Sequence, residues 1–148
     1  MNISEAFEIL EDDKEEFKNL SPELKKNKEI LMYCNPDFWN WDYEAMDEYK
    51  SIVKKYHSKD VEFIKSGVEK YGCDSSFLIM ADESLFENES LMLLAIKKDV
   101  SIGNPILWGS NSLKNNVLFL KKAISINPEI LELIHEESNI NAGIKGQL

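Results

Sequence analysis

Residues 82–98 read DESLFENESLMLLAIKK, and the order of polar and apolar residues in this stretch recurs along the chain. Asn88 follows a leucine by three residues, and Leu91, Met92 and Ala95 stand three, four and seven residues after it. An Asn or Asp side chain favours the N-cap of a helix, and apolar residues at this spacing form one buried stripe. The stretch therefore predicts a turn followed by a short amphipathic helix.

The same order of residues occurs around three further positions, so much of the chain is one repeated unit. The aligned polar residues are Asn27, Asp60, Asn88 and Asn116. The unit is about 28 residues long, with about five more in the first step. Three residues before each aligned position stand Leu24, His57, Leu85 and Leu113, and seven after each stand Cys34, Gly67, Ala95 and Ala123. The small residues predict that a neighbouring helix approaches closely.

Each unit predicts a hairpin of two short helices that cannot bury its apolar stripe alone, so we expect the hairpins to stack. The third unit predicts helices over 75–86 and 88–99, and the fourth predicts helices over 105–114 and 116–127. The predicted fold is all-α: a stack of short helical hairpins, resembling an α-solenoid. We expect a single helical-repeat domain over residues 1–141 and a flexible C-terminal tail over 142–148.

An extra helix is expected at the N-terminus. Apolar residues at helical spacing place Ile3, Phe7, Leu10 and Phe17 on one face. The next helix is expected to start at Ser21-Pro22, because Ser favours the N-cap and Pro the first helical position. The acidic run 11–16 lies within the first of these segments, and a solvated face of that helix is its simplest interpretation.

The repeat pattern, S/D-x-x-L-x-x-N/D-x-x-φφ-x-x-A, is carried by residues 82–98, by SNSLKNNVLFLKKAI (110–124) and more weakly by SPELKKNKEILMYC (21–34). It resembles the short tandem repeats of the bacterial domain-of-unknown-function family 4116. The resemblance covers most of 20–130, and the unit 54–71 departs from it with His57 and Gly67. It implies a helical repeat fold from a bacterial or phage source and carries no defined activity.

The composition argues against several classes of function. The formal net charge is −10, and all 17 basic residues are lysines. Direct nucleic-acid binding is not expected, because it needs a basic face and usually arginine forks. No apolar run approaches the length of a membrane span, so no membrane association is expected. A protein partner with a basic surface would be compatible with the charge.

The cysteines and histidines predict no catalytic or metal site. Cys34 occupies a small, buried position of the repeat, and Cys73 follows a glycine at a turn. We expect both to be reduced thiols of a cytoplasmic protein. His57 replaces a core leucine and predicts a half-buried imidazole, whereas His135 lies in a polar run. No cofactor is expected, because neither metal-ligand spacing nor a phosphate-binding loop occurs.

The best candidate site is the stretch CNPDFWNWDYEAMDEYK, residues 34–50, which belongs to the longer first step. Some of its aromatic residues should be core: Trp39 or Tyr43 could join Met46 and Tyr49 in a stripe that continues to Ile52 and Val53. Exposed Trp and Tyr among polar groups are typical anchors of protein interfaces. The residues predicted to bind a partner are Phe38, Trp39, Trp41, Asp42, Tyr43, Glu44, Asp47 and Glu48, with Asp37 adding to the negative field.

These observations predict a non-enzymatic protein-interaction module. More specifically, the chain would be a small acidic inhibitor or immunity-type protein that blocks a basic site on its partner. One alternative is a nucleic-acid mimic that acts on a nucleic-acid enzyme through rows of carboxylates. Another is a hydrolase that uses a carboxylate pair such as Asp42 with Glu44 or Asp47 with Glu48. The sequence does not show whether the acidic runs 11–16 and 37–48 lie side by side.

Overall fold

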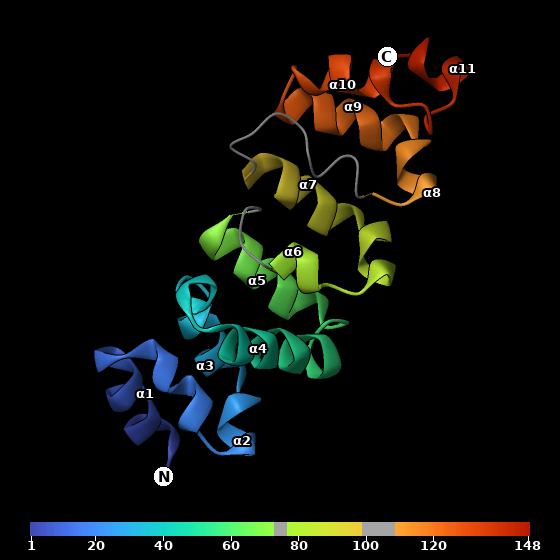
Figure 1. Cartoon of the computed structure of the whole chain (residues 1–148). Coiled ribbons are helices and arrows are strands. Elements are labelled where there is room, and N and C mark those ends of the chain that lie inside the picture. Colours follow the sequence, from blue (N-terminus) through green and yellow to red (C-terminus); the bar gives the residue numbers. More distant parts are fainter. Residues whose placement is uncertain (73–76, 99–108) are drawn as a thin grey trace. The chain divides into compact units, whose positions relative to one another are not determined.

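The computed structural model describes residues 1–72, 77–98 and 109–148, and every regular element in these ranges is a helix (Figure 1). The all-α prediction is therefore confirmed for the described part of the chain. Within that part, no helix combines the length and the apolar character needed to cross a membrane. The residues group into two compact units: 1–67 with 77–81, and 68–72 with 82–98 and 109–148. Helix α5 contributes residues to both.

The N-terminal unit contains the first repeat with the residues before it, most of the second repeat, and α6 from the start of the third. Its elements are α1 (Ile3–Asp12), η1 (Lys14–Asn19), α2 (Pro22–Lys25), α3 (Lys28–Cys34), η2 (Phe38–Asn40), α4 (Tyr43–Tyr56), the first part of α5 (Val61–Tyr71) and α6 (Phe77–Met80). The prefix η marks short 3₁₀ helices. The C-terminal unit contains η3 (Glu83–Glu87), α7 (Glu89–Lys98), α8 (Asn111–Lys114), α9 (Val117–Ile126), α10 (Ile130–Glu136) and α11 (Ala142–Lys145).

The turn of each repeat is closed in the same way. The side-chain oxygen of the aligned Asn or Asp accepts a hydrogen bond from the backbone N–H three residues later, at 2.8–3.1 Å. The backbone N–H of the same residue donates to the carbonyl three residues earlier, at 3.0–3.1 Å. The N-cap prediction is thus confirmed for Asn27, Asp60, Asn88 and Asn116.

The apolar stripe after each cap is also buried as predicted. The residues three and four positions after the caps are Ile30, Leu31, Phe63, Ile64, Leu91, Met92, Phe119 and Leu120, and each is at most 5 % exposed. Cys34, Ala95 and Ala123 at the small position are fully buried. The second helix of each unit therefore follows the sequence pattern closely: α7 and α9 start one residue after their caps.

The first helices of the third and fourth sequence repeats are shorter than predicted. A single helix over 75–86 is wrong, because α6 ends at Met80 and η3 starts at Glu83. Asp82 causes this break: its carboxylate accepts a hydrogen bond from the Ser84 N–H at 3.0 Å and so begins a new element. In the fourth unit α8 begins after the Ser110 cap. The predicted residues 75–76, 99 and 105–108 lie outside the described part.

The second sequence repeat departs from the repeat pattern at Gly67, and the structure gives a reason. A Cβ atom on Gly67 would stand 2.3 Å from the nearest ring carbons of Phe77. Phe77 itself is fully buried and also packs edge-on against Phe63, with 5.3 Å between ring centroids. The glycine is therefore needed for this close approach of α5 and α6.

The extra N-terminal segment is helical but not one helix. Ala6 and Leu10 of α1 are buried, and Phe17 reaches the core from the separate element η1. The helix is interrupted at Asp13, whose carboxylate accepts a hydrogen bond from the Glu15 N–H at 2.9 Å. The predicted start of the next helix is confirmed, with Ser21 as N-cap and Pro22 as first residue.

The buried residues of the two units differ in character. In the N-terminal unit Phe17, Phe38, Trp41 and Tyr49 form an aromatic cluster with ring centroids 4.5–6.5 Å apart. The C-terminal core is mainly aliphatic and includes Met92, Ile96, Leu120, Ile130 and Ile134. Ile144 and Leu148 pack partly buried against that core, although residues 142–148 were predicted as a tail. The predicted domain limits, 1–141 and 142–148, stay predictions.

Candidate functional site

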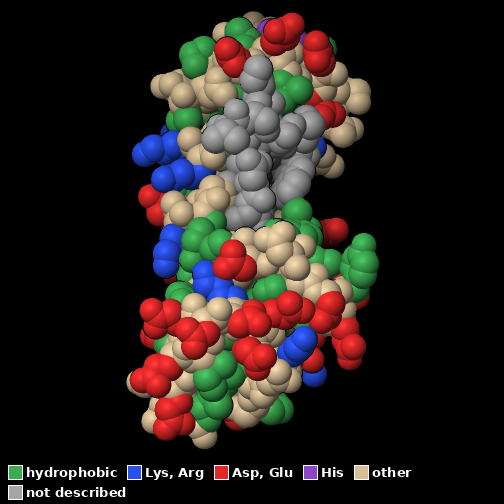
Figure 2. All heavy atoms as spheres, turned by 60° about the vertical axis from the view of Figure 1, so that its left-hand side comes forward, with side chains coloured by type: hydrophobic (Ala, Val, Ile, Leu, Met, Phe, Trp, Pro, Cys, Tyr) green, Lys and Arg blue, Asp and Glu red, His purple; other side chains and the backbone are tan. Residues whose placement is uncertain are grey.

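The two acidic segments 11–16 and 37–48 meet in one place. They line a cleft of about 400 Å³ in the N-terminal unit, beside the aromatic core. The carboxylates at the cleft are Glu11, Asp12, Asp13, Glu15 and Asp37, and the only basic residue among its described lining is Lys14. Figure 2 shows Asp and Glu side chains gathered over a face of this unit, in the lower part of the view. We call this feature the acidic cleft.

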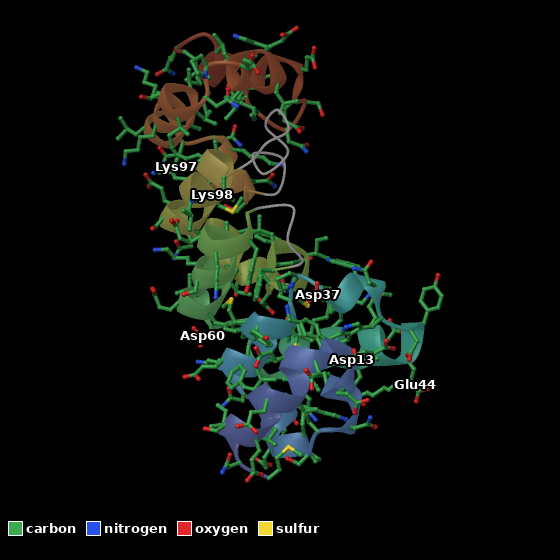
Figure 3. All side chains as sticks on the ribbon, turned by 90° about the vertical axis from the view of Figure 1, so that its left-hand side faces the viewer. Asp13, Asp37, Glu44, Asp60, Lys97 and Lys98 are labelled. Atoms are coloured by element: carbon green, nitrogen blue, oxygen red, sulfur yellow. The ribbon has the colours of Figure 1, made fainter. Side chains whose placement is uncertain are left out.

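Polar contacts hold the two segments together. The Lys14 ammonium lies 2.7 Å from a carboxylate oxygen of Asp37, which precedes η2. The backbone N–H of Asp42 donates a hydrogen bond to Glu15 Oε1 at 3.2 Å. Lys18 lies between Glu15 and Asp42, at 3.7 and 3.6 Å. Asp13 and Asp37, labelled in Figure 3, come one from each segment. The acidic segments 11–16 and 37–48 therefore lie side by side, which the sequence alone did not show.

Local structure explains why so many carboxylates meet here. Helix α1 ends at Asp12, and the caps at Asp13 and Asp42 start new elements at η1 and α4. A carboxylate that accepts N–H bonds at a helix start is stabilised in its charged form. Capping thus gives Asp13 and Asp42 a structural reason to be acidic. It gives none to Glu11 and Asp12 at the end of α1, where the helix dipole disfavours negative charge.

The charges around the cleft are stabilised at neutral pH. The pKa of Lys14 is raised because its ammonium donates a hydrogen bond to Asp37. The pKa of Lys18 is raised mainly by the negative charge of Glu15. The pKa of Asp42 is lowered, first by the hydrogen bond from the Ala45 N–H, and the Lys18 ammonium contributes to the same shift. Such shifts favour the charged form of each group.

The predicted aromatic anchors divide into two groups. Trp39 and Tyr43 are 45 % and 80 % exposed, whereas Phe38 is fully buried and Trp41 is 8 % exposed. Phe38 stacks on Tyr49 with ring centroids 4.5 Å apart, and Trp41 stacks on Phe17 at 5.4 Å. Phe38 and Trp41 are therefore core residues, so the exposed aromatic surface is narrower than predicted.

The expected core stripe of α4 also needs correction. Neither Trp39 nor Tyr43 belongs to it, and the buried residues of the helix are Ala45, Tyr49 and Val53. Met46 and Ile52 are only half-buried. Trp39 instead lies against Phe38, with 4.4 Å between ring centroids, and the Lys50 ammonium stands 5.5 Å from its ring centroid.

Most of the predicted acidic site residues already have an internal partner. Asp37 binds Lys14, Asp42 contacts Lys18, Asp47 lies 3.8 Å from Lys50, and Glu48 pairs with Lys25 at 2.5 Å. Glu44 is exposed, and its side chain has no hydrogen bond or ion pair within the described residues. The same holds for Glu11 and Asp12 at the cleft. These three exposed carboxylates are available to another molecule.

Two of the remaining candidates, Cys34 and His57, have structural roles. Cys34 is fully buried, and burial raises the pKa of its thiol to about 12, so it is a poor nucleophile. The prediction of a half-buried, satisfied imidazole is confirmed for His57, whose Nε2 lies 2.7 Å from the Lys26 carbonyl oxygen. His135 is exposed on α10. Cys73 lies outside the described residues. Within the described part, no three His, Cys, Asp or Glu side chains form a group that could hold a metal ion.

Comparison with protein-family models, with curated proteins and with solved structures gave no significant match. The function is therefore argued from the site alone.

Proposed function

We propose that the chain is a non-enzymatic interaction module whose acidic cleft blocks a basic site on a partner protein. The observation that carries this proposal is the meeting of two acidic segments in one cleft of about 400 Å³. A basic side chain or a short basic loop of the partner fits such a cleft in size and in charge. We further propose that the protein acts in the cytoplasm as a small acidic inhibitor.

Two groups of residues would divide the work. Glu11, Asp12 and Glu44 have exposed carboxylates with no partner among the described residues, and they would attract a basic surface and speed its association. Trp39 and Tyr43 present exposed rings in the 37–48 segment, and they would supply apolar anchoring area. Asp37 and Asp42, which pair with lysines of this chain, would mainly hold the cleft in shape.

The scaffold that carries the cleft is proposed to be a stack of helical hairpins. Four turns closed by the same hydrogen bonds support a tandem-repeat origin, as the resemblance to family 4116 implies. Stacked helical repeats usually present a surface to another macromolecule, which agrees with an interaction role.

Catalysis is less well supported than binding. A carboxylate that serves as a general acid at neutral pH needs a raised pKa. Asp42 and Asp60 have lowered pKa values instead. Lowered values keep a carboxylate charged, and a permanent charge suits the recognition of a basic group.

The test is affinity capture from a bacterial lysate with three folded proteins. They are the wild type, the site variant Trp39→Ala/Tyr43→Ala/Glu44→Lys and a control variant, Tyr56→Ala/Glu62→Lys. The control changes an exposed ring and an exposed carboxylate of the same unit outside the candidate site. We expect wild type and control to retain the same basic protein and the site variant to lose at least about tenfold in affinity.

Different results would redirect the proposal. Equal retention by all three proteins would remove Trp39, Tyr43 and Glu44 from the binding site. A retained nucleic-acid enzyme that DNA displaces would favour the mimic over the simple inhibitor. Circular dichroism of each variant shows beforehand that a loss of binding is not a loss of fold.

A further inference from the structure

The acidic cleft contains a cation that belongs to the chain itself. Lys14 is the only basic residue among the described residues that line it. Its side chain is 27 % exposed, although lysine side chains normally extend into solvent. The ammonium lies 2.7 Å from Asp37 and 4.7 Å from the centroid of the Tyr33 ring. A carboxylate and an aromatic face both attract an ammonium ion.

The neighbouring lysine provides a comparison. Lys18 is 44 % exposed, and its distances to Glu15 and Asp42 are 3.7 and 3.6 Å, about 1 Å longer than the contact of Lys14. It does not line the cleft. The two lysines stand four residues apart and carry the same charge, but only Lys14 occupies a position inside the cleft.

We infer that Lys14 is an internal competitor for the cationic group of the partner, and that a partner lysine takes its place between Asp37 and Tyr33. This inference rests on the proposed function of the acidic cleft. It makes Lys14 an autoinhibitory contact: the partner has to displace the Lys14 ammonium before its own can reach Asp37. Free Glu11 and Asp12 would attract the partner first, because no contact within the described residues occupies their carboxylates.

Displacement is compatible with the local structure. Lys14 is the first residue of η1, and the helical start depends on the Asp13 cap rather than on the lysine side chain. The Glu15–Asp42 contact would still join the two segments after Lys14 moved away. The flexible lysine stem can extend into solvent, where its ammonium is well hydrated.

The test measures binding of a pentalysine peptide by calorimetry at low ionic strength. We compare wild type with Lys14→Met, Lys14→Arg, Lys18→Met and Glu11→Gln/Asp12→Asn, after circular dichroism has shown that all are folded. Met keeps an unbranched apolar stem and removes the charge. If Lys14→Met is unstable, Lys14→Gln replaces it. We expect Lys14→Met to bind about three- to tenfold more tightly than Lys18→Met, because only the former frees the position between Asp37 and Tyr33. Lys14→Arg should bind like wild type.

The control variants separate the possible failures. Equal gains for Lys14→Met and Lys18→Met would mean that net charge alone matters, and this would overturn the competitor role. A loss of affinity in Lys14→Met would also overturn it, since the lysine would then support binding. Peptide binding that Glu11→Gln/Asp12→Asn leaves unchanged would contradict the proposed function of the acidic cleft instead, whatever Lys14 does.

Discussion

Gly67 stands where the other units have Cys34, Ala95 and Ala123, and the Phe77 ring fills the space next to it. In an ordinary helix interior, replacing Gly by Ala stabilises the protein by up to about 1 kcal/mol. Here the new methyl group would stand 2.3 Å from a fully buried ring. We therefore expect Gly67→Ala to lower the free energy of unfolding by about 1–3 kcal/mol. Urea unfolding measures it, and a stabilised variant would contradict the packing described for α5 and α6.

A second substitution isolates the cause. The double variant Gly67→Ala/Phe77→Leu replaces the ring by a smaller side chain. Because the two residues are in contact, their effects should not add, and the double variant should be less destabilised than the sum of the two single variants. Additive effects would show that the destabilisation by Gly67→Ala does not come from its contact with Phe77.

The aromatic residues of 37–48 show what single-residue patterns could not predict. A 3.6-residue period suggested which rings share a face, but Phe38–Asn40 form a 3₁₀ turn and Trp41 is extended, with φ −77° and ψ 167°. Side chains in such a segment do not follow the period of an α-helix. This is why Trp41 turned out to be buried while Trp39 is exposed. The burial of His57 was easier to predict, because its place in the repeat already indicated a partly buried side chain.

At the scale of the elements, the caps contribute to stability in a way that can be measured. Asn116 Oδ1 accepts the Phe119 N–H at 3.1 Å and starts α9. Asn116→Ala should lower the free energy of unfolding by about 1 kcal/mol, whereas Asn116→Ser should change it by a few tenths, because serine also caps helices. Equal losses in thermal or urea unfolding would show that the cap is not responsible.

Asp60 combines a cap with an ion pair, and pH separates the two. Its pKa is lowered, first by the hydrogen bond from the Lys28 ammonium and then by that from the Phe63 N–H. Because this pKa is lowered, the Asp60 carboxylate contributes to the free energy of unfolding. The contribution is fully present above the unfolded-state pKa of about 3.9 and is lost as the pH falls through the lower folded-state value. Asp60→Asn keeps a capping side chain and removes the charge.

We expect Asp60→Asn to be less stable than wild type at pH 7 by about 0.2–1 kcal/mol. The difference should shrink below pH 4 and vanish once Asp60 is protonated. Urea unfolding from pH 7 to pH 2 measures it. A difference that persists unchanged at pH 2 would assign the effect to packing or capping rather than to charge.

The second helix of each unit was predictable because cap and stripe lie within about ten residues of one another. The first helices were not, since they are short and compete with local caps such as Asp82, which starts η3. The same competition at Asp13 divides α1 from η1, although the apolar spacing through Phe17 suggested one face. Element type was therefore clearer from the sequence than element boundaries.

At the scale of the whole molecule, the contacts divide the described chain into two compact units. A destabilised core residue should therefore act mainly within its unit. Leu120 is fully buried in the C-terminal core, and Leu120→Ala should cost about 2–5 kcal/mol. Hydrogen exchange should increase more over 109–148 than over 1–67. An equal increase throughout would show that the two units open as one.

The acidic cleft is formed by segments that are distant in the sequence. For this reason the sequence alone did not predict it. Each acidic run is recognisable alone, but their meeting depends on contacts such as Lys14–Asp37 and Glu15–Asp42. Sequence separation hides such contacts, and abundant carboxylates made any pairing of them ambiguous. The division into paired and unpaired carboxylates likewise follows from the three-dimensional arrangement.

The four equally closed turns have a consequence for how such a chain can grow. Donor and acceptor of each turn lie within about seven residues, between the residue three before the cap and the residue three after it. A duplicated stretch of DNA that encodes one unit carries both partners of every turn bond with it. A newly copied unit thus begins with its turn intact and needs selection only on the contacts to its neighbours. Lengthening by duplication is for this reason a short evolutionary step.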